Sequence, residues 1–321
     1  MKEFQIKKKH HYVWAYYLKG WAKDGTNIWY ITKKGNVRSD SIRGIGYENH
    51  FYKVDILNDN DIEIINMMLK DCVPELKEIL LKLVANVHFI QQQALLIDNV
   101  RLHATDVSLS DIISNNLFEN YMSMQEASVV AVIRKLRAGE FSCLDDKETF
   151  WSLGHFMGHQ LSRTKRMRDM IRWSVTNSAG NEGARNVLMD FNKRHWWFMC
   201  AYIGTSLSMD ISLNQNRRVK VIENLTGTPF ITSDQPVINI NPDGHVGEAV
   251  DYYYPLSDKR ALIVLTSNHF EFENSITDES TIDFFNREIA SVAGDAIFSS
   301  DEEMILKYRL DFNKRKYKFH S

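Results

Sequence analysis

Residues 75–90 read ELKEILLKLVANVHFI, and this stretch decides the class of fold. It opens the longest part of the chain without proline, which runs from residue 75 to residue 228. Glycine is also absent from residue 47 to residue 138. Proline removes a backbone hydrogen bond and glycine costs conformational entropy, so a stretch that lacks both favours helices. Leu76, Leu80, Leu83 and Val87 repeat at helical spacing, which predicts an amphipathic helix within a long helical block.

The helical block is expected to cover residues 59–215. Gly139 predicts the end of one helix, and the acidic pair Asp145 and Asp146 favours the start of the next. A further helix is expected from about Glu182 to Gly204.

The two ends of the chain carry strand patterns instead. Residues 28–31, IWYI, are β-branched and aromatic, and the KKGN that follows them predicts a hairpin. Beyond residue 216, short apolar runs alternate with proline and asparagine, and a last helix is expected over 280–292. An isolated hairpin is marginally stable, so we expect the N-terminal hairpin to join the C-terminal strands in one mixed or antiparallel sheet.

This layout predicts an α+β fold in which the helical block packs on the sheet. The three segments are 1–58, which joins the C-terminal sheet, 59–215, the helical block, and 216–321, the C-terminal β/α region. We expect them to form one compact unit.

Composition excludes several classes of protein. Hydrophobic residues make up 44% and charged residues 25%, as in ordinary globular proteins, and the net charge of −2 excludes a uniformly cationic nucleic-acid binder. Three cysteines without a CxxC pair exclude a disulfide framework and a zinc ribbon. The N-terminus has no apolar core of a signal peptide, and the longest apolar run, 196–203, is too short to cross a bilayer. We therefore expect a cytoplasmic protein without membrane contact.

Residues 7–12, KKKHHY, place two imidazoles beside three cations. Aromatic residues at helical spacing after residue 13 predict a short helix with His10 and His11 at its N-terminal end. The helix dipole there favours a neutral imidazole, which a general base or a metal ligand requires. The alternative is a histidine pair that is hydrogen-bonded at a sheet edge.

Residues 230–237, FITSDQPV, predict a buried strand that ends at Asp234. A carboxylate at a strand end, held by the following proline turn, suits presentation to a substrate or metal. In the alternative interpretation, Asp234 only caps the turn through its own backbone.

Residues 154–159, GHFMGH, place two glycines and two histidines four residues apart on a helix. Gly154 and Gly158 would let another backbone approach closely. His155 and His159 are candidate metal ligands, with a third ligand such as Asp234 from elsewhere. The alternative is a pair of core histidines.

Three segments resemble the bacterial family of domain of unknown function 4238. They are HHYV with the following YLKGWA, the central QLSRT at 160–164, and FITSDQPV with the later PLS at 255–257. The resemblance covers about residues 10 to 265 and departs at Trp14, where proline is expected. It implies no activity, but it implies that the motif positions converge in space, namely His11, Gln160, Arg163, Ser233 and Asp234.

Basic residues gather after the central motif. Lys165, Arg168 and Arg172 form one stripe at helical spacing, and the tail from Lys307 interleaves cations with aromatic residues. Such patterns suit single-stranded nucleic acid, with phosphate pairing and base stacking, although a solvated helix face gives the same pattern. Substrate contacts are predicted for the stripe and for Ser233 and Tyr12.

The leading functional hypothesis is a nuclease-like phosphodiester hydrolase that acts as a toxin or phage-defence effector, with RNA favoured over DNA. His10 and His11 would act as base or metal ligand and Asp234 as orienting acid or metal ligand, with a divalent metal as an open option. Arg163 and Gln160 would hold a phosphate. The alternative hypothesis is a non-enzymatic binding or regulatory module that docks nucleic acid or a partner protein through the basic stripe. Phosphate-loop, dinucleotide-binding and nucleophile-elbow motifs are absent from the sequence.

Overall fold

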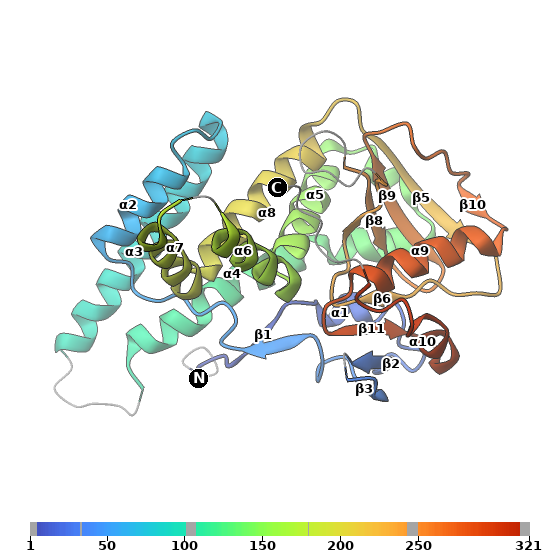
Figure 1. Cartoon of the computed structure of the whole chain (residues 1–321), viewed down its shortest axis with the longest axis horizontal. Coiled ribbons are helices and arrows are strands. Elements are labelled where there is room, and N and C mark those ends of the chain that lie inside the picture. Colours follow the sequence, from blue (N-terminus) through green and yellow to red (C-terminus); the bar gives the residue numbers. More distant parts are fainter. Residues whose placement is uncertain (1–4, 33, 101–106, 179, 243–249, 315–321) are drawn as a thin grey trace.

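Most of the long helices lie toward one end of the molecule, and the two larger sheets lie toward the other (Figure 1). The computed structural model describes residues 5–32, 34–100, 107–178, 180–242 and 250–314. The helical half contains α2 (Asp59–Met68), α3 (Pro74–Val100), α4 (Leu109–Ala138), α5 (Lys147–Ser162), α6 (Lys165–Asn177), α7 (Glu182–Arg194) and α8 (Trp196–Leu213), whereas the short α1 (Ala15–Leu18) lies beside the sheets. The α+β class predicted from the sequence is confirmed.

Helices α5 and α8 form the centre of the helical half. A Cβ atom on Gly158 would lie 2.5 Å from the carbonyl oxygen of Gly204, so the two backbones meet where neither residue has a side chain. A Cβ on Gly154 would likewise collide with the Ser212 hydroxyl. The close backbone approach predicted for this pair is therefore confirmed at Gly158, whereas Gly154 meets side chains of α8.

The single helix expected from Glu182 to Gly204 is wrong, because α7 and α8 are separate helices. The chain leaves helical geometry at His195, which has φ −122° and ψ 40°. The His195 ring is buried and lies 3.1 Å from the Asp61 carboxylate, so the break places this imidazole against α2.

The strands form two larger sheets and one short ribbon, rather than the single sheet that was expected. The strands are β1 (Lys9–His11), β2 (Asn27–Thr32), β3 (Val37–Ser41), β4 (Tyr47–Asn49), β5 (Arg218–Asn224), β6 (Thr232–Ser233), β7 (Ile238–Asn239), β8 (Tyr252–Pro255), β9 (Arg260–Leu265), β10 (Ser275–Ile276) and β11 (Ala296–Ser299). The β2–β3 hairpin joins the C-terminal strands in the order β3-β2-β11-β6, as predicted. The other C-terminal strands form a second sheet, β10-β5-β9-β8-β7, and β1 pairs with β4.

Two apolar clusters explain why the strands divide. On β8, Tyr252 and Tyr254 face the cluster shared with the helical half, while Tyr253 between them faces a second cluster. Phe285 of α9 (Glu279–Val292) stacks on Tyr253 at 4.3 Å between ring centroids, and Ile297 of β11 belongs to the same second cluster. With both faces of β8 and β9 buried, α9 and α10 (Glu302–Tyr308) fill the side away from the helical half.

Candidate functional site

The three motif segments meet at the C-terminal end of α5. The Gln160 side chain donates from Nε2 to the carbonyl oxygen of Tyr12 at 2.9 Å. Thr164 Oγ1 donates to Gln235 Oε1 at 2.6 Å. The start of the chain and the segment near residue 234 therefore both contact one helix end, although they are separated by more than 200 positions.

His10 lies in a strand rather than at a helix N-terminus, and both of its ring nitrogens are occupied. Its Nδ1 accepts a hydrogen bond from the Tyr52 backbone amide at 2.9 Å, so Nε2 carries the proton and donates to the Lys7 carbonyl at 2.9 Å. Burial lowers the pKa of His10 to about 4. The imidazole is neutral, as expected, but burial in the β1–β4 ribbon is the cause and not a helix dipole. Because neither ring nitrogen is free, His10 matches the alternative interpretation, a histidine that is hydrogen-bonded at a sheet edge.

Asp234 is anchored to the backbone that connects α9 to β11. Its two carboxylate oxygens accept hydrogen bonds from the Gly294 amide at 2.8 Å and the Asp295 amide at 2.7 Å. Burial raises the pKa of Asp234 to about 6, against the effect of these amides. Within the described residues, no hydrogen bond or ion pair joins Asp234 to His11. Asp234 therefore holds two segments together, and the expected pairing with His11 is not formed.

The predicted substrate contacts Ser233 and Tyr12 are buried. Ser233 Oγ donates to the Gln235 carbonyl and accepts from the Gln235 amide, which closes the turn after β6. The Tyr12 ring lies against Lys165, with 5.0 Å from Nζ to the ring centroid. Both side chains are packed inside the motif network rather than presented to solvent.

The basic stripe on α6 is paired with acidic residues of this chain. Lys165 Nζ lies 3.1 Å from Glu48 and 3.0 Å from Asp295, and Arg168 lies 2.8 Å from Glu48. Burial lowers the pKa of Arg172, which is partly buried at the end of the stripe. These pairings leave Lys165 and Arg168 less available to a phosphate than the sequence pattern indicated.

Two of the three cations in the described part of the basic tail are likewise paired with acidic residues, and the third, Arg309, is exposed. Lys307 lies 3.1 Å from Asp283, and Lys314 lies 3.1 Å from Asp311. The other cations and aromatic residues of the predicted tail, in residues 315–319, lie outside the described residues.

His155 and His159 share a face of α5, as their spacing predicts. Their rings lie 4.5 Å apart between centroids, and both Nε2 atoms are near the Tyr121 hydroxyl, at 3.5 and 3.3 Å. Burial lowers the pKa of both imidazoles. No three His, Cys, Asp or Glu side chains in the described parts of the chain are placed to hold one metal ion. Neither Asp234 nor another His, Cys, Asp or Glu of the described residues therefore supplies the expected third metal ligand.

Arg163 is the centre of a buried polar cluster. Its Nη1 lies 2.7 Å from Glu126 Oε1, and its Nη2 donates to Gln160 Oε1 at 2.5 Å. Its carbonyl oxygen accepts from the Tyr52 hydroxyl at 3.2 Å, and the same hydroxyl lies 3.1 Å from the His11 carbonyl. Arg163 is only 1% exposed, so its charge acts away from the screening of bulk water.

Glu119 and His11 border this cluster, and each has one buried polar atom without a hydrogen-bond partner in the described part of the chain. Burial raises the pKa of Glu119 to about 8, although the charge of Arg163 opposes the rise. Burial lowers the pKa of His11, and the charge of Arg163 adds to this effect. Glu119 Oε2 and His11 Nε2 are both buried without a hydrogen-bond partner among the described residues. A protonated carboxyl and a neutral imidazole are therefore the predominant forms here near pH 7.

Sequence reasoning missed Glu119 and Glu126, although α4 carries a signal for them. Met122, Val129 and Ile133 are buried on α4, and the two glutamates continue their spacing of three and four residues. Charged residues in an apolar stripe are costly to bury, so their presence indicates a paired or functional role.

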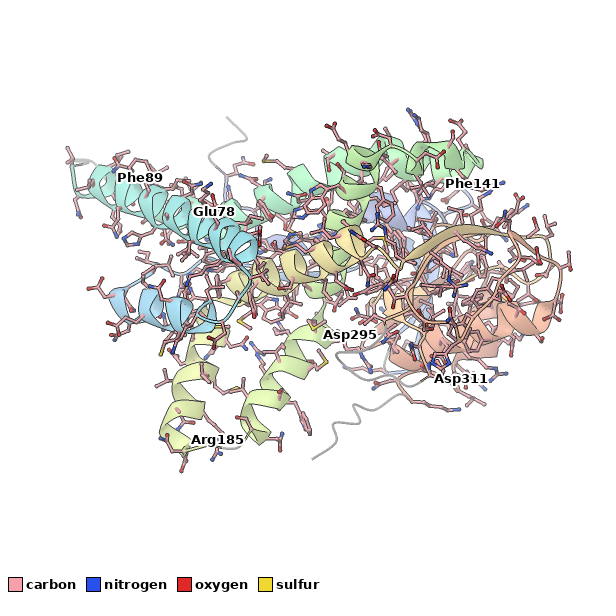
Figure 2. The ribbon with its side chains drawn as sticks, turned by 90° about the horizontal axis from the view of Figure 1, so that it is seen from above. Glu78, Phe89, Phe141, Arg185, Asp295 and Asp311 are labelled. Carbon is pink, nitrogen blue, oxygen red and sulfur yellow. The ribbon has the colours of Figure 1, made fainter. Side chains whose placement is uncertain are left out.

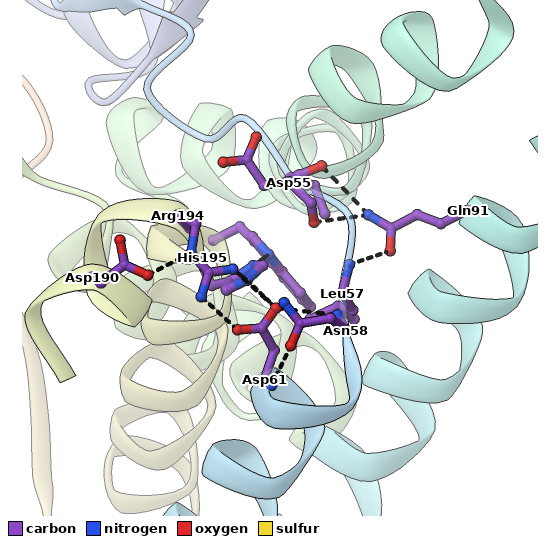
Figure 3. Close-up of polar contacts among 10 residues, drawn as sticks. Asp55, Leu57, Asn58, Asp61, Gln91, Asp190, Arg194 and His195 are labelled. Atoms are coloured by element: carbon purple, nitrogen blue, oxygen red, sulfur yellow. Dashed lines mark hydrogen bonds and ion pairs between the residues drawn. The ribbon is translucent and has the colours of Figure 1, made fainter. Parts of the chain in front are cut away.

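A second polar cluster joins α2 to the α7–α8 junction (Figure 3). Arg194 contacts both oxygens of Asp61, at 2.7 and 2.9 Å. Burial would raise the pKa of Asp61, but the hydrogen bonds from Arg194 outweigh it and lower the pKa to about 2. Trp197 Nε1 donates to His195 Nδ1 at 3.3 Å, which leaves the His195 proton on Nε2, facing Asp61. These groups are hydrogen-bond and ion-pair partners of one another, and they hold α2 against the α7–α8 junction.

Comparisons with known proteins place the chain in a family. No curated protein and no solved structure matches it. The family model described as protein of unknown function (DUF4238) matches residues 9–303, nearly the whole chain, which include all three motif segments. The chain therefore belongs to the DUF4238 family.

Proposed function

We propose that this protein is a hydrolase of phosphodiester bonds, with His11, Glu119 and Arg163 in its site. The observation that carries the proposal is a buried carboxyl and a buried imidazole beside one arginine, each with an atom that has no partner among the described residues. Buried polar atoms without partners are rare in proteins. Neighbouring groups with pKa values displaced in opposite directions are typical of acid–base sites.

The chemistry follows from the protonation states. The neutral His11 ring accepts the proton of the attacking hydroxyl as its oxygen bonds to phosphorus. Glu119, protonated near neutral pH, gives its proton to the leaving oxygen as the bond from phosphorus to that oxygen breaks. Arg163 stabilises the negative charge that develops on the phosphoryl oxygens.

The surroundings of His11 favour an anionic substrate. Lys9 lies two residues before His11 on the same face of β1, and its Nζ lies 4.4 Å from the centroid of the Tyr47 ring. The His11 ring packs on the same tyrosine, at 5.7 Å between centroids. We favour RNA because its own 2′-hydroxyl can be the attacking group that His11 activates. A toxin or phage-defence role in the cytoplasm is the setting that we propose for such an activity.

The test compares Glu119→Gln and His11→Asn with the wild type on RNA and on DNA, each with and without Mg²⁺. His269→Asn, at an exposed histidine, is the matched control. We expect each site variant to cleave at least about 100-fold more slowly than the wild type, which is the lower limit of what a general acid or base contributes to a rate. The control should retain full activity. Inactivity of the wild type on every substrate, or full activity of both site variants, would exclude the proposal.

The second candidate function is a non-enzymatic binding module. It is favoured by the burial of most motif residues, since His10, Gln160, Ser233 and Asp234 are each at most 2% exposed and hydrogen-bonded. In this case, Glu119→Gln and His11→Asn leave partner binding intact. Partner capture by the wild type and by both site variants, without cleavage of RNA or DNA, would support it over the hydrolase.

A further inference from the structure

We propose that Tyr121, His155 and His159 form a binding site for a transition-metal ion such as Zn²⁺ or Cu²⁺. The site lies between α5 and α4, which ends shortly before Phe141 in Figure 2. His155 and His159 are one turn apart on α5, and Tyr121 on α4 faces both of them. No cysteine, carboxylate or further histidine of the described residues completes the histidine pair, so the phenol oxygen is the third ligand.

The distances among these side chains fit a metal site better than a hydrogen-bonded cluster. The Tyr121 oxygen lies 3.5 Å from Nε2 of His155 and 3.3 Å from Nε2 of His159. Hydrogen bonds of hydroxyl and N–H groups are usually about 2.5–3.2 Å long, so both contacts are long for such bonds. Two donor atoms that bind one tetrahedral ion at about 2.0 Å are about 3.3 Å apart. Both distances therefore match the spacing of ligands around one ion.

The donor atoms are of the types that such an ion prefers. Imidazole nitrogen together with an anionic oxygen suits Zn²⁺ and Cu²⁺, whereas Mg²⁺ and Ca²⁺ prefer oxygen ligands alone. Burial lowers the pKa of both imidazoles, which keeps them in the neutral form that binds metals. As the phenol oxygen of Tyr121 bonds to the ion, its proton is released to solvent, and the ligand set then carries one negative charge.

The surroundings allow an ion to enter and to be retained. Tyr121 and His155 are partly exposed, whereas His159 is only 1% exposed, so the site opens to solvent on one side. Three protein ligands and one open position are typical of zinc sites that also bind water or a small ligand. Arg163, one turn beyond His159, would repel a cation, but its charge is paired with Glu126 at 2.7 Å.

The second ring nitrogen of His159 limits the affinity of the site. This Nδ1 atom is buried without a hydrogen-bond partner among the described residues. Metal-binding histidines usually donate the proton of this nitrogen to an acceptor, and loss of such an acceptor weakens binding by about 10–100-fold. We therefore expect weaker binding than at structural zinc sites, with an ion that exchanges with solvent.

The test is calorimetric titration with Zn²⁺ of the full chain, from which a chelator has removed bound metal. Tyr121→Phe removes only the phenol oxygen and His155→Gln removes a partly exposed ring, while His269→Gln, at an exposed histidine, is the control. We expect the wild type and the control to bind one equivalent, and each site variant to bind at least about tenfold more weakly. No substrate is involved, so the outcome is independent of the proposed hydrolase activity.

Cu²⁺ gives a second readout that reports on Tyr121 itself. A phenolate bound to Cu²⁺ absorbs visible light through charge transfer, so this band should appear with the wild type and with His269→Gln and be absent with Tyr121→Phe. Without metal, Tyr121→Phe should melt close to the wild-type temperature, because it keeps the packed ring. Zn²⁺ should raise the melting temperature of the wild type more than that of Tyr121→Phe.

Three outcomes would overturn the proposal. The wild type could bind neither ion. Both site variants could bind Zn²⁺ as tightly as the wild type. The Cu²⁺ complex of the wild type could lack the charge-transfer band, which would place the ion on histidines without Tyr121.

Discussion

At the scale of single residues, the buried polar groups of this protein differ in how fully they are paired. His10 uses both ring nitrogens and Asp234 uses both oxygens for backbone partners, so each stabilises one arrangement of the chain. Glu119 and His11 each keep an atom without a partner among the described residues. His10 and Asp234 therefore stabilise the fold, whereas proton transfer by Glu119 and His11 belongs to the proposed hydrolase function.

The pKa of Glu119 predicts how stability depends on pH. The folded protein holds this proton up to about pH 8, whereas an unfolded glutamate releases it near pH 4.5, so ionisation opposes folding as the pH rises between these values. Glu119→Gln cannot ionise and should be more stable than the wild type at pH 9, by roughly 5 kcal/mol, with little difference at pH 4. Urea unfolding at pH 4, 7 and 9 measures this. An identical pH profile for both proteins would show that Glu119 is not buried in this way.

The pKa of His10 predicts the opposite dependence. Folding keeps His10 neutral down to about pH 4, whereas the unfolded chain binds a proton near pH 6.5, so stability falls as the pH falls through this window. In His10→Gln, folding stability should fall less steeply as the pH falls. At pH 7 the variant should be about 1–3 kcal/mol less stable than the wild type, because the stacked contact with Tyr52 is lost. Thermal melts from pH 4 to pH 7 test this, with the exposed His269→Gln as control. A fall in His10→Gln as steep as in the wild type would contradict the assignment.

At the scale of elements, one helix crossing positions much of the site. Helix α5 carries Gln160 and Arg163 at its C-terminal end, and its position is fixed by close packing on α8. Helix α4 supplies Glu119 and Glu126 on one face toward Arg163. A displacement of α5 against α8 would therefore move the arginine away from its carboxylate partner.

Gly158→Ala should disrupt this crossing. The added Cβ would lie 2.5 Å from the Gly204 carbonyl oxygen, which belongs to the backbone and cannot rotate away. We expect a loss of roughly 2–3 kcal/mol in the free energy of unfolding, measured in urea. Gly227→Ala is the control, since its nearest neighbour would be 3.7 Å away. Equal stability of the two variants would mean that the helices can separate without cost.

At the scale of the whole molecule, the motif network joins three distant parts of the sequence. The β1 segment, the end of α5 and the turn after β6 contact one another, and Asp234 connects this network to α9 and β11. The helical half and the sheet half therefore meet at these motifs. The hydrogen bonds between the motifs help to fix the position of one half relative to the other.

Asp234→Ala tests this structural role. It leaves two backbone amides without their acceptor, which should cost about 1–3 kcal/mol and lower the melting temperature by a few degrees. Asp234→Asn, which keeps one acceptor oxygen, should lie between the alanine variant and the wild type. Calorimetry measures the change. Loss of hydrolase activity at an unchanged melting temperature would instead assign Asp234 a direct role in the reaction.

The sequence by itself determined the α+β class, the helix-rich middle and the strands at both ends, because these follow from local periodicity and from the positions of proline and glycine. It also identified Gly154 and Gly158 as a place of close approach. Periodicity reports which faces are buried, so these features needed no knowledge of long-range contacts.

Only the tertiary structure decided which polar residues share a site and how the strands divide. His195 interrupts a pattern that reads as one helix because its ring is bound to Asp61, more than 130 positions earlier. The stripe at Lys165 and Arg168 reads as a free basic surface until Glu48 and Asp295 are placed beside it. Charge pairing and burial depend on residues that are distant along the chain, and a local pattern carries no information about them.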